Sequence, residues 1–535
     1  MAPPQPPLRP GSGPAPPEPV FVEPIAVAGE TYWVDADAGD DANDGRTEAT
    51  AFRSLQRATA ALNKAGGDRL WLKGRFLETL TVAGLNPSAH PTRRTVVQVA
   101  FNAAGEPYEA IIDGGLTSPG DFPFDRQGLP AGFGSGEGGY LDRGVIISDC
   151  QYVTVSGLTI RGISGNGVLT WRSSHVRLEH LDVSWTSESA LNLANGQVTD
   201  PMVSDLSIAY CRINQSNLGH WANEATGSGY SMRSETVTIV ACNGFEVVGN
   251  HVSNSLMEGI DFKFGSRNGV IRGNLIENTR SAAIYVNEGD DAEIFHNDIR
   301  RIGWFDPQDG SGIKEAAPFL EQRLGIAVRA DSSVGISIAN GDLEPHRAFE
   351  TGRSSGIRVY ENVVSWTRDN GLVIWNEWRI RGEQGWLLDD IQIFNNVFHR
   401  SCQDELGNFA VQFDVGVTNC LIANNIVTEP GRPGMDIWES TAGAFSSSNT
   451  VLNNYFYLSP AGGFRGFDPL FGDPGIVALP AGLFDDGDYR LLPNSLAVDA
   501  GIEVSLPVRG SAGVDIGAFQ LDVPEWSAGL LRKSP

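Results

Sequence analysis

Positively charged residues are scarce in this sequence. Lysine and arginine number 39 against 65 aspartates and glutamates, so the formal charge is -26 at pH 7 over 535 residues. Nucleic-acid binding requires a basic surface, and an acidic chain repels a polyanion on average. The composition therefore argues against nucleic acid as a partner, while a local basic cluster can still hold an anionic sugar.

Long hydrophobic runs are also missing. No stretch approaches the roughly 18 apolar residues that a membrane span needs, so we expect no membrane-spanning segment. Residues 1–28 are rich in proline and lack the apolar core of a signal peptide, which predicts a flexible, disordered linker. An acidic chain without a span is typical of a secreted or extracellular protein, and we expect a monomer.

Cysteine is rare, and the five cysteines show no C-x-x-C spacing. Their odd number and their spacing argue against a metal knuckle. We expect mostly buried thiols, with room for one disulfide. The five are Cys150, Cys211, Cys242, Cys402 and Cys420.

Glycine is abundant, at 63 residues, and accompanies a repeated phrase. A short strand that begins with a small residue is followed by a turn and by a second strand that ends in asparagine and one or two apolar residues. The first of these asparagines are 24 and 23 residues apart, a period typical of one coil of a parallel β-solenoid. We expect the asparagines to form a structural ladder along the stack. They are Asn250, Asn274, Asn297, Asn362, Asn396, Asn425 and Asn454.

The first strand of each coil alternates with a period of two. In "GIDFK" at 259, "AIYVN" at 283 and "GIAVR" at 325, the second and fourth residues are apolar and point into the coil, so the third and fifth point outward. From residue 261 onward these outward positions are polar or aromatic. Stacked strands lie about 4.8 Å apart, so the outward side chains form one stripe, which is the candidate groove. The stripe contains Asp261, Lys263, Tyr285, Asn287, Arg329, Trp375, Gln412, Asp414, Asp436 and Trp438.

Insertions and end caps complete the predicted organisation. Residues 303–323 and 376–390 are long insertions that we expect to wall the groove. A helical pattern over residues 51–65 is expected to cover the open N-terminal end of the stack. The acid-rich segment 35–45 is expected to be a turn rather than a calcium loop.

The segments "YWVDADAGDDANDGRTEATAFRSLQRATAAL", "GIDFKFGSRNGVIRGN", "AIYVNEGDDAEIFHNDI", "FDPLFGDPG", "DYRLLPNSLAVDAG" and "VDIGAFQ" resemble right-handed parallel β-helix proteins of the pectate-lyase-like superfamily. The resemblance covers nearly the whole chain after residue 29. It implies an all-β, right-handed parallel β-helix over 29–464, with an N-terminal capping helix and long loop insertions, and a C-terminal capping segment over 465–535. The superfamily includes polysaccharide lyases, glycoside hydrolases, epimerases and adhesins, so fold and activity must be argued separately.

Lyases of this kind use a lysine or arginine base, often with calcium. By that resemblance we expect Lys263 and Arg329 to be catalytic, together with Asp261, in β-elimination on a uronic-acid polysaccharide. An amine is a useful base only when its pKa falls toward neutral pH. The expected calcium ligands are Glu258, Asp261, Glu288 and Asp291, and the expected substrate-binding residues are Tyr285, Asn287, Trp375, Glu377, Trp378, Asp414, Asp436 and Trp438.

Two other functions fit the same face. A glycoside hydrolase could use Asp414 and Asp436 as a carboxyl pair with Glu377 nearby. A non-catalytic glycan-binding protein or adhesin would need only the aromatic residues and the loops. For the central strand we expect Ile260 and Phe262 to be buried and the side chains of Asp261 and Lys263 to face solvent; without a catalytic role, those two would form an ordinary exposed ion pair.

Overall fold

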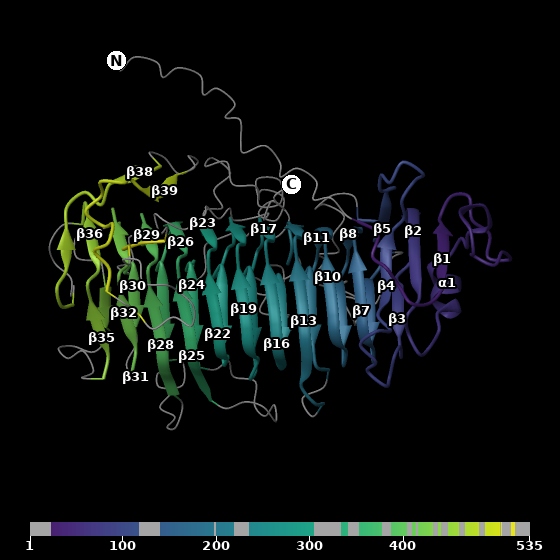
Figure 1. Cartoon of the computed structure of the whole chain (residues 1–535), viewed down its shortest axis with the longest axis horizontal. Coiled ribbons are helices and arrows are strands. Elements are labelled where there is room, and N and C mark those ends of the chain that lie inside the picture. The colour runs from purple at the N-terminus through teal and green to yellow at the C-terminus, as the bar shows by residue number, and fades with distance from the viewer. Residues whose placement is uncertain are drawn as a thin grey trace, which may run out of the picture.

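Short parallel strands, wound as successive coils, form this protein in the computed structural model (Figure 1). Each strand pairs with a strand of the next coil, so the coils stack from the N-terminal end of the elongated molecule to the C-terminal end. The predicted all-β parallel solenoid is confirmed. The structure describes residues 23–116, 140–196, 200–218, 235–303, 333–340, 352–376, 387–403, 409–413, 416–431, 437–439, 448–459, 466–480, 487–502, 504 and 515–518.

The strands that begin each repeat form one ladder, named sheet 1, which has eleven strands in the described part of the chain. Sheet 1 contains β3 (Leu80–Ala83), β6 (Arg143–Ser148), β9 (Asn166–Trp171), β12 (Leu191–Ala194), β15 (Val237–Val240), β18 (Ile260–Lys263), β21 (Ile284–Asn287), β24 (Ile336–Ala339), β27 (Leu372–Trp375), β30 (Val411–Phe413) and β34 (Ile437–Glu439).

Two further ladders join because β2 pairs with β4 through its first half and with β5 through its second. Sheet 2 contains β1 (Thr31–Asp35), β2 (Arg69–Phe76), β4 (Thr95–Val99), β7 (Gln151–Ser156), β10 (Ser174–Glu179), β13 (Val203–Ala209), β16 (Cys242–Val248), β19 (Arg267–Arg272), β22 (Asp290–Phe295), β25 (Arg353–Tyr360), β28 (Leu387–Phe394), β31 (Val417–Thr418), β32 (Leu421–Ala423) and β35 (Thr450–Leu452). Sheet 3 contains β5 (Ala110–Asp113), β8 (Thr159–Ile163), β11 (Asp182–Thr186), β14 (Arg212–Asn214), β17 (His251–Ser253), β20 (Leu275–Glu277), β23 (Asp298–Ile302), β26 (Val363–Thr367), β29 (Val397–His399), β33 (Ile426–Thr428), β36 (Tyr455–Tyr457) and β37 (Leu470–Phe471).

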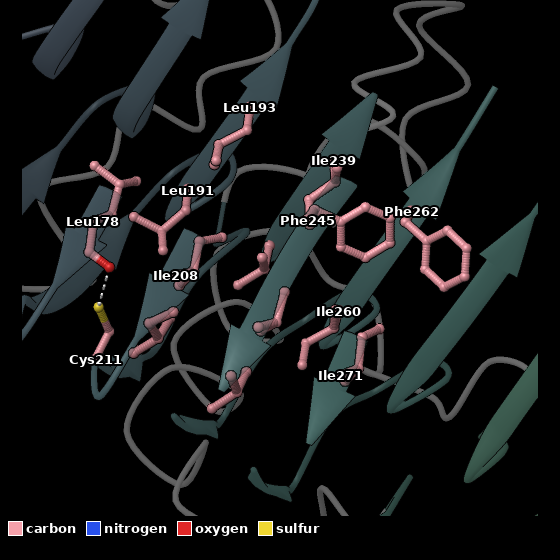
Figure 2. Close-up of a cluster of buried hydrophobic side chains, with 14 of the residues drawn as sticks. Leu178, Leu191, Leu193, Ile208, Cys211, Ile239, Phe245, Ile260, Phe262 and Ile271 are labelled. Carbon is pink, nitrogen blue, oxygen red and sulfur yellow. Dashed lines mark hydrogen bonds between the residues drawn. The ribbon is translucent and has the colours of Figure 1, made fainter. Parts of the chain in front are cut away.

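The inward residues of the three sheets pack into one continuous apolar core. Ile260 and Phe262 of sheet 1 belong to it, as predicted, and Figure 2 shows both side chains among those of the neighbouring coils. The ring of Phe262 lies 5.0 Å from that of Phe245 on sheet 2, which fixes the inward direction of the alternation. Burial of each such side chain contributes roughly 1.5–3 kcal/mol. Close packing explains the small residue that precedes β18. A Cβ on Gly259 would lie 2.6 Å from the carbonyl oxygen of Ala283 in the next coil.

The predicted asparagine ladder is confirmed. Asn250 Nδ2 donates to Asn274 Oδ1 at 3.0 Å, and Asn274 Nδ2 donates to Asn297 Oδ1 at 2.9 Å. The same Oδ1 atoms accept from the backbone amide of the previous asparagine, at 2.9 and 3.1 Å. The pattern continues to Asn454, and every member is fully buried. The ladder thus satisfies turn backbone that the core would otherwise leave unpaired.

The N-terminal helix is shorter than predicted. It is preceded by the 3-10 turn η1 (Glu48–Thr50), and α1 spans Leu55–Ala61. The Ser54 side chain accepts from the Arg57 amide and starts α1 as its N-cap. Leu55 is buried against the first coils, and α1 lies at the N-terminal end of the stack (Figure 1).

Carboxylates of the acid-rich segment 35–45 accept hydrogen bonds from nearby backbone amides. Asp35 accepts from the amides of residues 37 and 38, and Asp41 accepts from those of residues 53 and 54. These bonds fit the predicted turn.

The described residues between 476 and 518 pack against the flank of the last coils. The antiparallel strands β38 (Ile476–Ala478) and β39 (Asp488–Leu491) lie beside sheet 3 (Figure 1). Tyr489 and Leu491 form an apolar cluster with residues of β26, β29, β33 and β36. The predicted domain boundaries stay predictions, since the contacts do not define separate units.

Three details differ from the sequence interpretation or complete it. β21 pairs directly with β24 (Ile336–Ala339), while the expected coil strand at 325 and Arg329 lie outside the described residues. Residues 387–390 of the second expected wall begin β28 in sheet 2, while 304–323 and 377–386 lie outside the described residues. All five cysteines are buried and free, so no disulfide forms.

In the described ranges, no helix is both long enough and apolar enough to cross a membrane.

The ladder yields a stability prediction. Asn297→Ala removes the acceptor of the Asn274 amide and leaves buried polar groups unpaired, each at about 1–3 kcal/mol. We expect the free energy of unfolding to fall by at least about 2 kcal/mol in a denaturant titration. Asn243→Ala, at an exposed position on β16, is the matched control and should change it by less than about 0.5 kcal/mol. Equal effects of the two changes would contradict a stabilising ladder.

Candidate functional site

Four charged side chains meet on the outer face of β15 and β18. Asp261 and Lys263 are the outward residues of β18, while Glu235 and Glu258 lie two residues before the first residues of β15 and β18. The parallel register pairs Val237 with Ile260, so equivalent positions of the two coils lie side by side. These four residues are named the acid–lysine cluster.

Lys263 is the centre of the cluster. Its Nζ donates to Glu235 Oε1 at 2.6 Å and forms an ion pair with Asp261 Oδ2 at 3.2 Å. The second oxygen of Glu235 accepts from Thr238 Oγ1 at 3.0 Å. Both oxygens of Glu235 are therefore engaged, and one ammonium faces two carboxyl groups.

The expected solvent exposure of the central pair is wrong. Asp261 is 0% exposed and Lys263 is 4% exposed, although both point away from the core. The alternation predicted the face correctly, but an outward direction does not give exposure where other side chains cover the sheet. Glu235 is also buried and Glu258 is partly buried, so the cluster lies in a region of low dielectric.

The pKa values of Glu258 and Asp261 are raised, which favours the protonated form of both carboxyl groups. Burial raises the pKa of Glu258 to about 7, with repulsion from Glu235 adding to the effect and a hydrogen bond from Ser281 (2.7 Å) opposing it. Burial also raises the pKa of Asp261 well above its usual range, although Lys263 acts in the opposite direction. Perturbed carboxyl groups of this kind are typical of functional sites.

The pKa of Lys263 is raised, whereas the expected base would have a lowered pKa. Burial lowers the pKa of Lys263, but the charges of Glu235 and Asp261 outweigh burial and hold it above its ordinary value. The ammonium therefore keeps its proton at neutral pH. A lysine base needs a lowered pKa, whereas the described neighbours of Lys263 raise its pKa.

The structure describes some of the remaining stripe residues and not others. Tyr285 and Asn287 lie on β21, in register with Asp261 and Lys263, and Trp375 on β27 is 40% exposed. The structure brings these residues onto the same face, and their substrate-binding roles stay predictions. Trp438 belongs to β34, but its side chain is not described. Arg329, Glu377, Trp378, Asp414 and Asp436 lie outside the described residues.

Two of the expected calcium ligands lie on different sheets. Asp291 is exposed on β22 of sheet 2, whereas Asp261 is buried on sheet 1 beside the Lys263 ammonium. Within the described ranges, no three acidic, histidine or cysteine side chains are grouped so as to hold a metal ion. Because a buried cation already lies beside Asp261, we derive no step through calcium, and calcium binding stays a prediction.

Glu235 is the residue that the sequence interpretation missed. Its signal was available, because "ETVTIV" at 235 and "EGIDFK" at 258 place a glutamate at the same distance before aligned strands. Thr238 and Asp261 then occupy the same outward position. Alignment of the residues that precede the strands would have found it.

One family model matches part of the chain. Residues 143–343 match the family model described as the right handed beta helix region. A pectate lyase structure is 13% identical with a TM-score of 0.42, covering 93% of this chain and 97% of that one. The A-module of a mannuronan C-5 epimerase from Azotobacter vinelandii is 12% identical with a TM-score of 0.43, and a surface protein and adhesin from Streptococcus pneumoniae is 12% identical with 0.45; both comparisons cover 78% of this chain and 96% of the other. No curated protein matches the sequence.

The family match identifies the architecture as a right-handed parallel β-helix. The predicted right-handed parallel β-helix is thereby confirmed for the fold. Identities near 12% do not carry an activity, so the function must be argued from the cluster.

The raised pKa of Glu258 gives a pH prediction. The ordinary value is 4.5 and the folded value is about 7, so the stability contributed by this group is present below 4.5 and is lost as the pH rises through 7. Glu258→Gln mimics the protonated form. We expect the variant to gain stability relative to the parent between pH 4.5 and 8, measured by urea unfolding. A difference that stays constant over this range would contradict the shift.

A second prediction concerns the buried ion pair. Lys263→Met leaves Glu235 buried without its cation and should lower the free energy of unfolding by roughly 3–5 kcal/mol. Adding Glu235→Gln removes the unpaired charge and should restore part of the loss. Additive losses in the double variant, compared with each single variant, would show that the pair is not coupled.

Proposed function

We propose that this protein is a secreted carbohydrate-active enzyme that cleaves glycosidic bonds of a polysaccharide at the acid–lysine cluster. The observation that carries the proposal is the unequal environment of two glutamates. Glu258 is partly exposed with a pKa of about 7, and Glu235 accepts a 2.6 Å hydrogen bond from an ammonium. Glycoside hydrolysis requires such a pair, one carboxyl group that donates a proton and one carboxylate that acts as its partner.

In this proposal Glu258 is the general acid. A pKa near 7 keeps much of the group protonated at neutral pH and still allows it to release the proton to the leaving oxygen. Ser281 holds one oxygen, and the other, Oε2, accepts no hydrogen bond from the described residues. Ser281 thus fixes the orientation of the glutamate.

Glu235 is the carboxylate partner, and Lys263 holds it in place. The ammonium and Thr238 fix both oxygens of Glu235, so its direction is set before substrate binds. Lys263 then acts by charge and position rather than as a base. This assignment differs from the expected role of Lys263, because its neighbours raise its pKa.

An extended substrate suits the face on which the cluster lies. Trp375 lies on β27 at the position equivalent to Lys263, three strands away, which corresponds to about 14 Å. An exposed indole is a typical platform for a sugar ring. A chain of several sugars could therefore lie along sheet 1 and contact both.

Cleavage by β-elimination is the second candidate. It is favoured by one observation, the buried ammonium of Lys263, which could stabilise an enolate-like intermediate. The proton acceptor would then have to be another group. A monomeric state and a calcium requirement are further predictions from the sequence.

The proposal is tested by product analysis on a panel of neutral and uronic-acid polysaccharides. Glu258→Gln should lower kcat by about 10²–10⁴-fold and remove the pH limb near 7. Glu235→Gln should also abolish most activity. Reducing ends without ultraviolet-absorbing unsaturated products indicate hydrolysis, whereas unsaturated products indicate elimination.

Thr81→Ala, at an exposed position on β3 of the same sheet, is the matched control and should leave kcat unchanged. Normal activity of Glu258→Gln with a folded protein would overturn the assignment of this residue. Loss of activity in the control as well would point to a structural effect.

A further inference from the structure

One column of outward residues crosses sheet 1 through Lys263. The strand register places one residue of each strand from β3 to β27 in this column. Most of these side chains are short, and the exceptions are Lys263 itself and two tryptophans, one of which, Trp171, lies before the predicted stripe begins. In chain order the column contains Ala83, Ser148, Trp171, Ala194, Val240, Lys263, Asn287, Ala339 and Trp375.

Trp171 and Trp375 lie symmetrically about Lys263. Trp171 on β9 is three strands before β18, and Trp375 on β27 is three strands after it. At about 4.8 Å per strand, each of these positions is about 14 Å from that of Lys263, and the two are about 29 Å apart. A disaccharide is too short to contact both, whereas a longer sugar chain that contacts both must cross the acid–lysine cluster.

Both indoles reach the surface of the protein. Trp375 is 40% exposed, and Trp171 is partly exposed. The neighbours of Trp171 in the column are Ser148 and Ala194, and Ala339 precedes Trp375. Because these short side chains cannot cover an indole, part of each ring stays open to a ligand outside the sheet.

The two indoles differ from aromatic residues that have a packing role. On sheet 2 the ring of Tyr360 stacks between those of Phe295 and Phe394, at centroid distances of 4.8 and 5.1 Å. Among the described residues, neither Trp171 nor Trp375 stacks on another aromatic ring. The face of an indole is negative and complements the C–H groups on one face of a sugar ring. The two sheet 1 indoles are therefore suited to such a contact.

The short residues between the two indoles have a different role. Ala194, Val240, Asn287 and Ala339 are all buried. Ala194 and Val240 pack with Phe264 in a small apolar cluster outside the main core. Sugar contacts are therefore assigned to the two indoles and not to the short residues between them.

We propose that Trp171 and Trp375 each bind a sugar ring of the same polysaccharide chain, one on either side of the acid–lysine cluster, and that the enzyme consequently cleaves internal bonds. This inference rests on the proposed function for the place of cleavage, and it adds two binding subsites and an endo mode of action. A chain that contacts indoles on both sides of the cluster has its reacting bond in its interior rather than at one end.

Affinity electrophoresis in pectate, alginate, glucuronan and neutral xylan measures binding without requiring cleavage. In the polymer that retards the wild-type chain most, Trp171→Ala and Trp375→Ala should each weaken binding about three- to tenfold, as expected for loss of one stacking contact. Trp171→Tyr keeps an aromatic face and should retain most of the affinity. Trp185→Ala, at a partly exposed position on β11 of sheet 3, is the matched control and should bind as the wild type does.

Oligosaccharides of the same polymer, from two sugars upward, are then added in the cold as competitors. The affinity of the wild type should rise steeply once a chain is long enough to reach both indoles, because the second contact is then intramolecular. Trp171→Ala and Trp375→Ala should each lose this rise, and Trp185→Ala should keep it. Thermal unfolding of all variants separates loss of a contact from loss of the fold.

Digestion by the wild type should first release a mixture of long fragments, with a rapid fall in viscosity. Three results would overturn the inference. They are no retardation of the wild type by any of the four polymers, unchanged binding in both alanine variants, and release of a single short product from the start of digestion. Failure of the proposed function is distinguishable, because Glu258→Gln and Glu235→Gln would then cleave normally while the two alanine variants still bind more weakly.

Discussion

The interaction on which the rest of the structure depends is the hydrogen-bonded stacking of one coil on the next. Parallel strand pairing sets the spacing, and the asparagine ladder from Asn250 to Asn454 satisfies the turns at the same point of the coils it spans. Because each asparagine donates to its successor, a coil cannot shift its register without breaking buried bonds on both sides. Equivalent residues of successive coils are therefore forced into columns.

The columns explain how residues that are distant in sequence form one site. Glu235 and Lys263 are 28 residues apart, yet one step between coils brings them to 2.6 Å. The stack fixes this distance without a ligand. The free energy needed to hold the charges together is therefore supplied by folding. A solenoid thus provides a preorganised polar face on a scaffold whose stability comes from its apolar interior.

The electrostatics of the cluster follow from the number of charges it buries. One ammonium lies among three carboxyl groups, so it cannot neutralise all of them in a region of low dielectric. The cluster relieves the imbalance by shifting Glu258 and Asp261 toward their protonated forms, while Lys263 keeps its proton.

The sequence by itself determined the parallel β-helix, the asparagine ladder and the inward direction of Ile260 and Phe262, because these features repeat with the period of one coil. It also placed Asp261 and Lys263 on the outward face. Only the tertiary structure decided that both are buried, that Glu235 joins them, and that β24 pairs with β21. Periodicity reports the direction of a side chain. Burial and pKa depend on which charges the neighbouring coils bring within a few ångströms, and that is a property of the stack rather than of any single repeat.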